Sequence, residues 1–225
     1  MVSNWNCPFW GNYGKIDFMK ILLEPGVGEI EEKKSRFIAH LCVVKTEEEA
    51  VAFFEKTKKE YWDAKHNCTA FVIGEDARLT RCSDDGEPAQ TAGRPILNVL
   101  LHSEVRNVAC VVTRYFGGTL LGTGGLIKAY SDATADALAK SVIGEEVAGV
   151  KIPFTLDYDA YGKVQYEFGR QNLNIEDGVF TEKITAAVTV PKEKEEEIRK
   201  LLVEITLGKA VIGDSAECVI VRRVL

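Results

Sequence analysis

The chain has 225 residues, a formal net charge of −6 and an ordinary share of apolar residues, enough for one long globular domain or two small ones. The acidic charge is spread evenly, so composition gives no support to non-specific nucleic-acid binding, and any such site must be a local basic patch. No apolar run approaches the roughly 20 residues that span a bilayer, and no signal peptide is recognisable, so we expect no membrane partner. The six cysteines are scattered, which favours a reduced cytoplasmic protein.

The first 18 residues differ from the rest of the chain. They are rich in aromatic residues, Asn and Gly but show no periodicity, and Met19 is a natural start. We therefore expect residues 1–18 to be a disordered extension. After it, a charged run leads into a predicted strand at residues 36–44, and Thr46 with Glu49 three residues later has the pattern of a capping box that opens a helix.

The next segment alternates strands and loops. Strands are expected at residues 68–73 and 79–83, and an acidic loop, SDDGEPAQTAG, follows the second of them. Pro95 stands near the first turn of a short predicted helix at about 93–102. Strands joined through one short helix usually lie close together, so we expect the loops that follow strands 79–83 and 108–113 to lie side by side.

The stretch from Cys110 to Tyr130 combines a buried strand, five glycines and a helix, whose apolar residues recur at helical spacing from Leu126 onward. Glycine permits positive φ and lets a ligand approach the backbone closely, and N–H groups at the start of a helix bind anions. The alternative is that the glycines only form a tight crossover, because their spacing matches neither GxGxxG nor the phosphate loop that ends in Gly-Lys-Ser/Thr.

Residues 144–149 have the composition of a linker. Beyond it, periodicity indicates strands at residues 150–158, 184–190 and 216–224 and two helices, the second of which begins at Pro191. The compact βαββαβ order of this part is typical of a ferredoxin-like fold. The predicted fold class is thus α+β, with one domain at residues 19–145 and another at 150–225.

Two groups of side chains have the composition of reactive sites. Asp84, Asp85 and Glu87 lie close to Arg81; such carboxylates can hold Mg²⁺ or move protons, but Asp, Gly and Pro are equally expected in an exposed turn. His66 and Cys68 share a strand face and are candidates for a metal pair or for a base and a nucleophile. Because paired ligand spacing is missing, Cys68 is better interpreted as a core thiol, and we expect no metal and no cofactor.

Four motifs stand out in the first domain: KKSRFIA (33–39), HNCTA (66–70), RCSDDGEP with TAGRPIL (81–97) and NVACVVTRYFGGTLLGTGGLIKAY (107–130). In this order they resemble the IMPACT family, specifically its bacterial YigZ-type members. The resemblance covers residues 19–145, and the second domain looks like the C-terminal domain of the same proteins. Gln90 stands where the family usually has glycine, and Lys128 stands where arginine is common.

The resemblance implies an N-terminal β-α-β domain like that of GHMP kinases and a ribosomal small-subunit protein. It implies a C-terminal ferredoxin-like domain similar to the last domain of elongation factor G. Eukaryotic relatives act in translational control. Because exposed groups fall inside the motifs, we expect them to bind a ligand; no catalytic residue is identified. The candidate ligand-binding residues are Lys34, Arg36, His66, Arg81, Asp84, Asp85, Glu87, Thr91, Arg114, Tyr115, Gly117, Gly118, Gly122, Gly124, Gly125 and Lys128.

Two functions are compatible with these residues. The first is a cytoplasmic, translation-associated regulatory protein that contacts RNA, the ribosome or a translation factor through a glycine-rich anion-binding cleft. Its local basic surface would consist of Lys33, Lys34, Arg36, Lys65, Arg81, Arg114 and Lys128. The net acidity and the lack of basic stretches interleaved with aromatic residues argue against this function.

The second function is a phosphotransferase or hydrolase that uses the same cleft, with the carboxylates of the acidic loop as metal ligands or base. The chain lacks the serine pair of GHMP kinases, so we favour binding over catalysis. The sequence does not indicate an oligomeric state.

Overall fold

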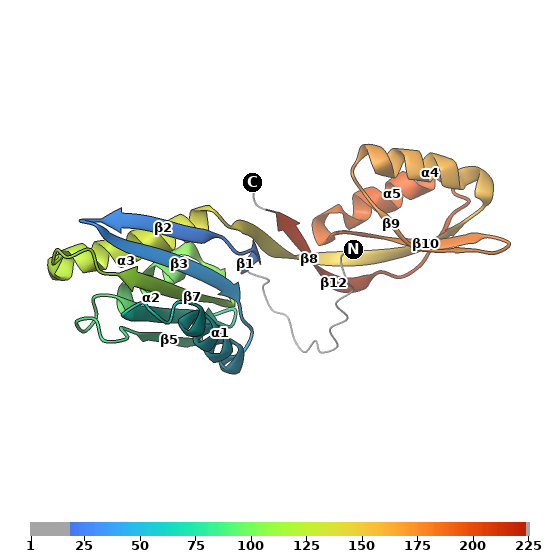
Figure 1. Cartoon of the computed structure of the whole chain (residues 1–225). Helices are drawn as coiled ribbons and strands as arrows, with labels where there is room; N and C mark the ends of the chain where they lie inside the picture. The colour runs from blue at the N-terminus through green and yellow to red at the C-terminus, as the bar shows by residue number, and fades with distance from the viewer. Residues whose placement is uncertain (1–18, 224–225) are drawn as a thin grey trace. The chain divides into compact units, whose positions relative to one another are not determined.

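The computed structural model describes residues 19–223 of the chain (Figure 1). The extension that we expect to be disordered, residues 1–18, lies outside the described residues. The described chain forms two compact units, one of residues 19–146 with 221–223 and one of residues 147–220. In this part of the chain, no helix is long and apolar enough to cross a membrane.

Five antiparallel strands form the sheet that carries the candidate site. Their order is β2 (Val27–Glu32), β3 (Ser35–Val43), β7 (Val108–Tyr115), β4 (His66–Ile73) and β5 (Leu79–Ser83). β5 folds back on β4 as a hairpin, and β4 rather than β5 pairs with β7. β5 and β7 therefore run in the same direction with β4 between them, and both end at the same end of the sheet.

Different helices cover the two faces of this sheet, because successive residues of a strand point to opposite faces. Cys68, Ala70 and Val72 of β4 belong to a core with α2 (Gly93–Ser103) and α3 (Gly122–Ala139). Phe71 and Ile73 of the same strand pack with α1 (Glu47–Glu60) on the opposite face. The predicted cap of α1 is confirmed, since the hydroxyl of Thr46 accepts a hydrogen bond from the N–H of Glu49 at 3.3 Å.

Helix α3 begins at Gly122, four residues before the predicted start, so that Gly122, Gly124 and Gly125 form its first turn instead of a loop. Small residues seat the helix on β2. A Cβ atom at Gly28 would overlap the backbone of Ala133 and Ala137. The outer edge of β2 is covered as well, because the N–H of Glu29 donates to a carboxylate oxygen of Asp136 at 2.8 Å.

Strand β8 (Val142–Leu156) corrects the interpretation of residues 144–149 as a linker, because these residues lie inside its 15 residues. Its first residues pair with β1 (Met19–Glu24), which also pairs with β6 (Val105–Arg106). From Gly149 onward it pairs with β10 of the other unit. Glycine and glutamate are common in loops, but strand pairing uses only the backbone and accepts both.

The unit of residues 147–220 has the predicted βαββαβ order. Its helices, α4 (Tyr158–Arg170) and α5 (Glu195–Thr206), lie on one side of the strands, as Figure 1 shows. Phe154, Phe168 and Leu202 are buried in the core between helices and strands. The strands pair in the order β12 (Ala216–Arg223), β8, β10 (Ile184–Pro191) and β9 (Ile175–Phe180). The short strand β11 (Val211–Ile212) also pairs with β8. A 3₁₀ turn (Lys192–Lys194) precedes α5.

The contact between α3 and β2 is tested by Gly28→Ala. The added methyl group meets backbone atoms of α3 that cannot move aside, so we expect the free energy of unfolding to fall by about 1–3 kcal/mol in urea denaturation. Gly162→Ala in α4 is the matched control, because nothing lies within 4 Å of its added Cβ and alanine favours the helix. A Gly28→Ala protein as stable as the wild type would contradict this packing.

Candidate functional site

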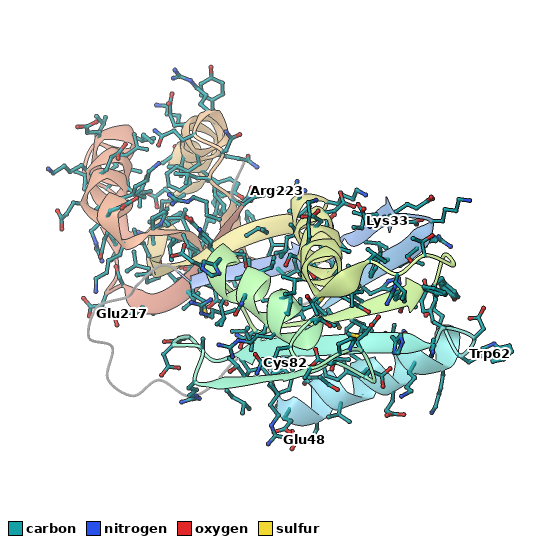
Figure 2. The ribbon with its side chains drawn as sticks, turned by 90° about the vertical axis from the view of Figure 1, so that its left-hand side faces the viewer. Lys33, Glu48, Trp62, Cys82, Glu217 and Arg223 are labelled. Atoms are coloured by element: carbon teal, nitrogen blue, oxygen red, sulfur yellow. The ribbon has the colours of Figure 1, made fainter. Side chains whose placement is uncertain are left out.

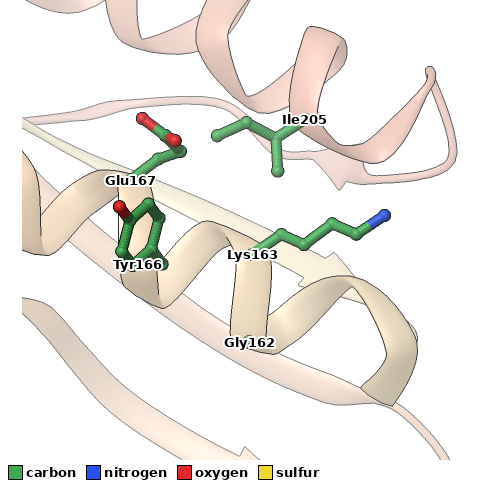
Figure 3. A pocket seen from close by; sticks show the side chains of 5 residues that line it. All are labelled: Gly162, Lys163, Tyr166, Glu167 and Ile205. Atoms are coloured by element: carbon green, nitrogen blue, oxygen red, sulfur yellow. The ribbon is translucent and has the colours of Figure 1, made fainter.

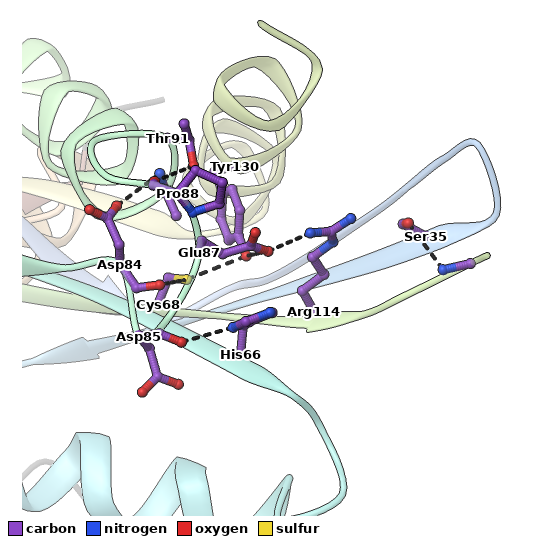
Figure 4. Close-up of polar contacts among 12 residues, drawn as sticks. Ser35, His66, Cys68, Asp84, Asp85, Glu87, Pro88, Thr91, Arg114 and Tyr130 are labelled. Atoms are coloured by element: carbon purple, nitrogen blue, oxygen red, sulfur yellow. Dashed lines mark hydrogen bonds and ion pairs between the residues drawn. The ribbon is translucent and has the colours of Figure 1, made fainter. Parts of the chain in front are cut away.

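A buried ion pair lies at the end of the sheet where β4 begins and β5 and β7 end (Figure 4). Nη1 of Arg114 in β7 is 2.5 Å from Oε1 of Glu87 in the loop after β5, and only 8% and 3% of these side chains are exposed. Tyr130 of α3 donates a hydrogen bond to the same oxygen at 2.9 Å. Burial raises the pKa of the Tyr130 hydroxyl, which therefore stays protonated. Because buried charges are costly unless paired, these side chains hold β7, the loop and α3 together.

Aromatic rings enclose the rest of the Arg114 guanidinium. Its Cζ lies 5.4 Å from the ring centroid of Phe37 and 5.6 Å from that of Phe116, within the range of cation–π attraction. Phe116 is itself 55% exposed. Nε of Arg114 is buried and has no hydrogen-bond partner among the described residues. The guanidinium thus keeps an unused donor next to an exposed ring.

Asp84 caps α2 from a loop that precedes the helix. Its carboxylate accepts hydrogen bonds from the N–H groups of Gln90 (2.8 Å), Ala92 (3.0 Å) and Gly93 (2.8 Å), which satisfies donors that the start of a helix leaves without partners. Gln90 has a φ of 64°, a left-handed conformation that the glycine usual in the family adopts without strain. The geometry of the loop therefore explains why Asp84 is an aspartate and why glycine is usual at position 90.

Asp85 fastens the acidic loop to β4. Its carboxylate accepts hydrogen bonds from the N–H of Asn67 (2.7 Å) and from Lys58 (3.3 Å), and its carbonyl oxygen lies 2.8 Å from Nδ1 of His66. Cys68 instead contacts the carbonyl oxygen of Asp84 at 3.1 Å, and burial raises the pKa of its thiol. His66 and Cys68 therefore do not form a base and a nucleophile, and the interpretation of Cys68 as a core thiol is confirmed.

The three carboxylates of the acidic loop are thus engaged within the protein. The Thr91 hydroxyl follows the same pattern and donates to the carbonyl oxygen of Pro88 at 2.7 Å. Within residues 19–223, no group of three or more His, Cys, Asp or Glu side chains is placed to hold a metal ion.

The turn between β2 and β3 presents two lysines in an uncommon conformation. Lys33 and Lys34 have φ values of 47° and 66° and form the two-residue loop of a hairpin. Such a turn favours Asn-Gly, because both positions are left-handed. Both side chains are exposed and form no ion pair with the described residues. The hairpin turn itself requires these φ values, so the two lysines stand out only by their unpaired charges.

The glycine-rich segment after β7 lies directly against this hairpin. Gly117 donates its N–H to the Ser35 hydroxyl at 3.1 Å, and a Cβ at residue 117 would overlap the backbone of Lys34. Close approach thus explains Gly117, and positive φ values of 86° and 73° explain Gly118 and Gly122. The structure has no such explanation for Gly124, whose φ is not positive and whose added Cβ would meet nothing within 4 Å.

The first turn of α3 leaves its N–H groups uncovered. Leu121 at the start of the helix provides no side-chain cap, and within the described part of the chain the first turn contains no acidic residue. Lys128, one turn further on, pairs with Asp132 at 2.5 Å. This hydrogen bond raises the pKa of the lysine, and the charge of Glu32 in the hairpin adds to the effect. We call Lys33, Lys34, the segment 117–125 and Lys128 the tip surface.

Other predicted site residues lie elsewhere. Arg81 pairs with Glu47 at the start of α1, on the sheet face opposite Arg114. On that face too, Arg36 pairs with Glu29 at 2.5 Å, and the Tyr115 hydroxyl donates to Asp63 at 2.8 Å. The predicted single basic surface is therefore wrong. Arg36 and Arg81 lie on the α1 face, paired with glutamates, and Arg114 is buried on the other face, because alternate strand residues face opposite sides.

The sequence did not identify Tyr130, Phe37 and Ser35 as parts of this site. Tyr130 fits the apolar spacing of α3, which by itself predicts only a core residue. A signal was available, since a tyrosine that is fully buried normally finds a partner for its hydroxyl. Ser35 gave no comparable signal, because its bond to Gly117 joins residues 82 positions apart.

A separate cavity of about 400 Å³ lies in the unit of residues 147–220, between α4 and α5 (Figure 3). It contains none of the predicted site residues. Gly162 leaves the space open between the side chains around it. The lining residues are Gly162, Lys163, Tyr166, Glu167 and Ile205.

Comparison with known proteins supports the resemblance seen in the motifs. Residues 33–138 match the family described as Impact N-terminal domain, and residues 154–209 match the Domain of unknown function (DUF1949). The IMPACT family member YvyE of Bacillus subtilis is 38% identical over 191 residues, which cover 85% of this chain and 88% of that protein.

The IMPACT family member YigZ of Escherichia coli is 36% identical over 180 residues, which cover 79% of this chain and 88% of that protein. A solved structure titled "Crystal structure of an hypothetical protein" is 33% identical, covers 88% of this chain and 97% of its own, and has a TM-score of 0.57. The predicted resemblance to bacterial YigZ-type proteins is confirmed.

The buried ion pair is tested by Glu87→Met alone and together with Arg114→Met. The single change leaves a buried arginine without its partner, so we expect the free energy of unfolding to fall by about 3–5 kcal/mol in urea denaturation. The double change should recover much of this loss, because two apolar side chains of similar volume have no charge to desolvate.

Asp132→Asn is the control for this test, since it breaks the exposed pair with Lys128 and should change the stability by at most about 1 kcal/mol. If Glu87→Met were as harmless as this control, the buried pair would not hold the site together.

Proposed function

This chain belongs to the IMPACT family. We propose that it is a translation-associated regulatory protein and that its tip surface binds the phosphate groups of RNA. The link to translation comes from the family resemblance, in which eukaryotic relatives act in translational control. The choice of an anionic ligand comes from the geometry of the tip surface.

Gly124 is the observation that carries the proposal. A glycine in a helix costs up to about 1 kcal/mol relative to alanine, yet neither its φ nor the surrounding space requires glycine here. Because glycine has no side chain, a ligand can approach the backbone of the first helical turn closely, and the uncapped N–H groups there can bind phosphate. Gly162 and Gly169 of α4 share the open space and the ordinary φ, but only Gly124 stands in the first turn of its helix, so we assign Gly124 to the ligand.

The neighbouring lysines fit the same ligand. Lys33 and Lys34 bring two unpaired positive charges to the loop that contacts the glycine segment. Phosphate contacts by lysines supply most of the affinity of non-specific nucleic-acid binding, so a local patch suffices although the whole chain is acidic. Contact with RNA on the ribosome, or beside a translation factor, is the proposed setting.

The alternative of a phosphotransferase or hydrolase has less support. Its acidic groups would have to be Asp84, Asp85 or Glu87, and these carboxylates bind backbone N–H groups, Lys58 or Arg114. The likenesses to GHMP kinases, to a ribosomal small-subunit protein and to the ferredoxin-like last domain of elongation factor G are part of this proposal and remain predictions. The last two would suit a protein of the translation machinery.

The role of the lysines is tested by the double change Lys33→Asn with Lys34→Gly. Asn-Gly is the preferred sequence of this turn, so the free energy of unfolding should stay the same or rise by up to about 1 kcal/mol. Binding of a fluorescein-labelled 12-nucleotide oligo(U), measured by anisotropy, should weaken. The slope of log affinity against log salt should become shallower by about one to two units, one for each lost phosphate contact.

Lys194→Gln with Lys200→Gln is the matched control, because it removes two exposed lysine charges from the other unit. This control should leave RNA binding unchanged. Equal affinities and equal salt slopes of the two double variants would overturn the proposal.

Gly124→Ala separates binding from folding. The helix should gain about 0.5–1 kcal/mol of stability, because alanine favours helix and its methyl group meets no atom. The methyl group should hold a phosphate away from the N–H groups, so RNA affinity should fall by about tenfold, which corresponds to the loss of about one good hydrogen bond. Gly162→Ala should show the gain in stability without the loss of binding; a Gly124→Ala protein with undiminished affinity would contradict the role of the helix start.

A further inference from the structure

Trp62 is presented to solvent on a fixed segment of backbone. The indole is 82% exposed. The residues around it are held: the N–H of Tyr61 donates to the Thr57 carbonyl oxygen (2.9 Å), the N–H of Ala64 donates to the Tyr61 carbonyl oxygen (3.1 Å), and Asp63 accepts a hydrogen bond from Tyr115 (2.8 Å). The largest of all side chains is thus exposed at a point where the backbone does not move freely.

Lysines flank Trp62 on both sides. Lys59 and Lys65, three residues before and after it, are exposed and form no ion pair with the described residues. The segment 58–66, KKEYWDAKH, therefore places basic and aromatic residues together, contrary to the expectation that the chain lacks such stretches, and it also contains the acidic Glu60 and Asp63. Asp63 within it is engaged by Tyr115. Exposed aromatic rings among lysines are typical of surfaces that bind single-stranded nucleic acid.

Trp62, which follows α1, is linked to the tip surface around the end of the sheet by the covalent chain and by one hydrogen bond. Asp63, next to Trp62, is bonded to Tyr115, and the chain continues from Tyr115 through the exposed Phe116 to Gly117, which lies against Lys34. The register agrees, because Arg36 in β3 pairs with Tyr115, and the start of β4 at His66 pairs with Arg114. Figure 2 labels Lys33 and Trp62 at this same end of the sheet.

We infer that the RNA bound at the tip surface is single-stranded, and that its bases stack on Trp62 and Phe116 while its phosphates contact the lysines and the start of α3. This inference rests on the proposed function and adds the class of ligand. A single strand exposes the faces of its bases, whereas a duplex keeps them in its own stack. Aromatic rings and positive groups thus occur together at one end of the sheet, and a single strand offers both base faces and phosphates to them.

The test compares a fluorescein-labelled 12-nucleotide oligo(U) with a 12-base-pair RNA duplex, both measured by anisotropy. The wild type should bind the single strand at least about tenfold more tightly. Trp62→Ala should weaken that binding by about 5- to 100-fold, the usual effect of losing one stacked base. Trp62→Phe should retain most of the affinity, because a phenyl ring still stacks, and neither change should alter the thermal melting temperature.

Tyr166→Ala is the matched control, since this aromatic residue is 67% exposed on α4 in the other unit and should not affect RNA binding. If Lys33→Asn/Lys34→Gly weakens binding but Trp62→Ala does not, and the two RNAs bind equally, the inference is wrong while the proposed function stands. If neither RNA binds the wild type, both are wrong. Selective loss of single-strand binding in Trp62→Ala, with rescue by Trp62→Phe, supports the inference.

Discussion

The pairing of Arg114 with Glu87 is the interaction on which this end of the first unit depends, because two opposite charges removed from water must remain together. Glu87 can reach Arg114 only when the loop after β5 is folded, and Asp84 and Asp85 fold that loop onto the start of α2 and of β4. Tyr130 joins α3 to the same carboxylate. The position of each of these elements is therefore defined by a hydrogen-bonded charge as well as by apolar packing, which alone is not directional.

Close contacts between backbone segments position the tip surface next to this ion pair. Gly28 allows α3 to lie on β2, and Gly117 allows the segment after β7 to lie on the hairpin turn. The two contacts hold α3 on β2 and the segment that leads into α3 on the turn that carries Lys33 and Lys34. In the proposed function, such a support would bind an anion at little cost in ordering, since its donors are already in place.

Local signals were sufficient for much of the fold. The capping box predicted the start of α1, and the βαββαβ order followed from the spacing of apolar residues. β2 gave no such signal, because its core-facing residues include Gly28 and Glu32 and it is stabilised by pairing with β3 and by α3. The continuity of β8 through residues 144–149 was missed for a related reason: its partner strands lie far away in the chain.

By itself, the sequence determined the family, the α+β class, the place of most elements and the loops that carry polar groups, because these depend on motifs, periodicity and turn chemistry. Only the tertiary structure decided which polar groups meet. Arg81 and Arg114 look equivalent in the sequence, yet one pairs with Glu47 on the α1 face and the other is buried with Glu87 on the opposite face. Strand register makes this choice, and register depends on hydrogen bonds between segments that are distant in sequence.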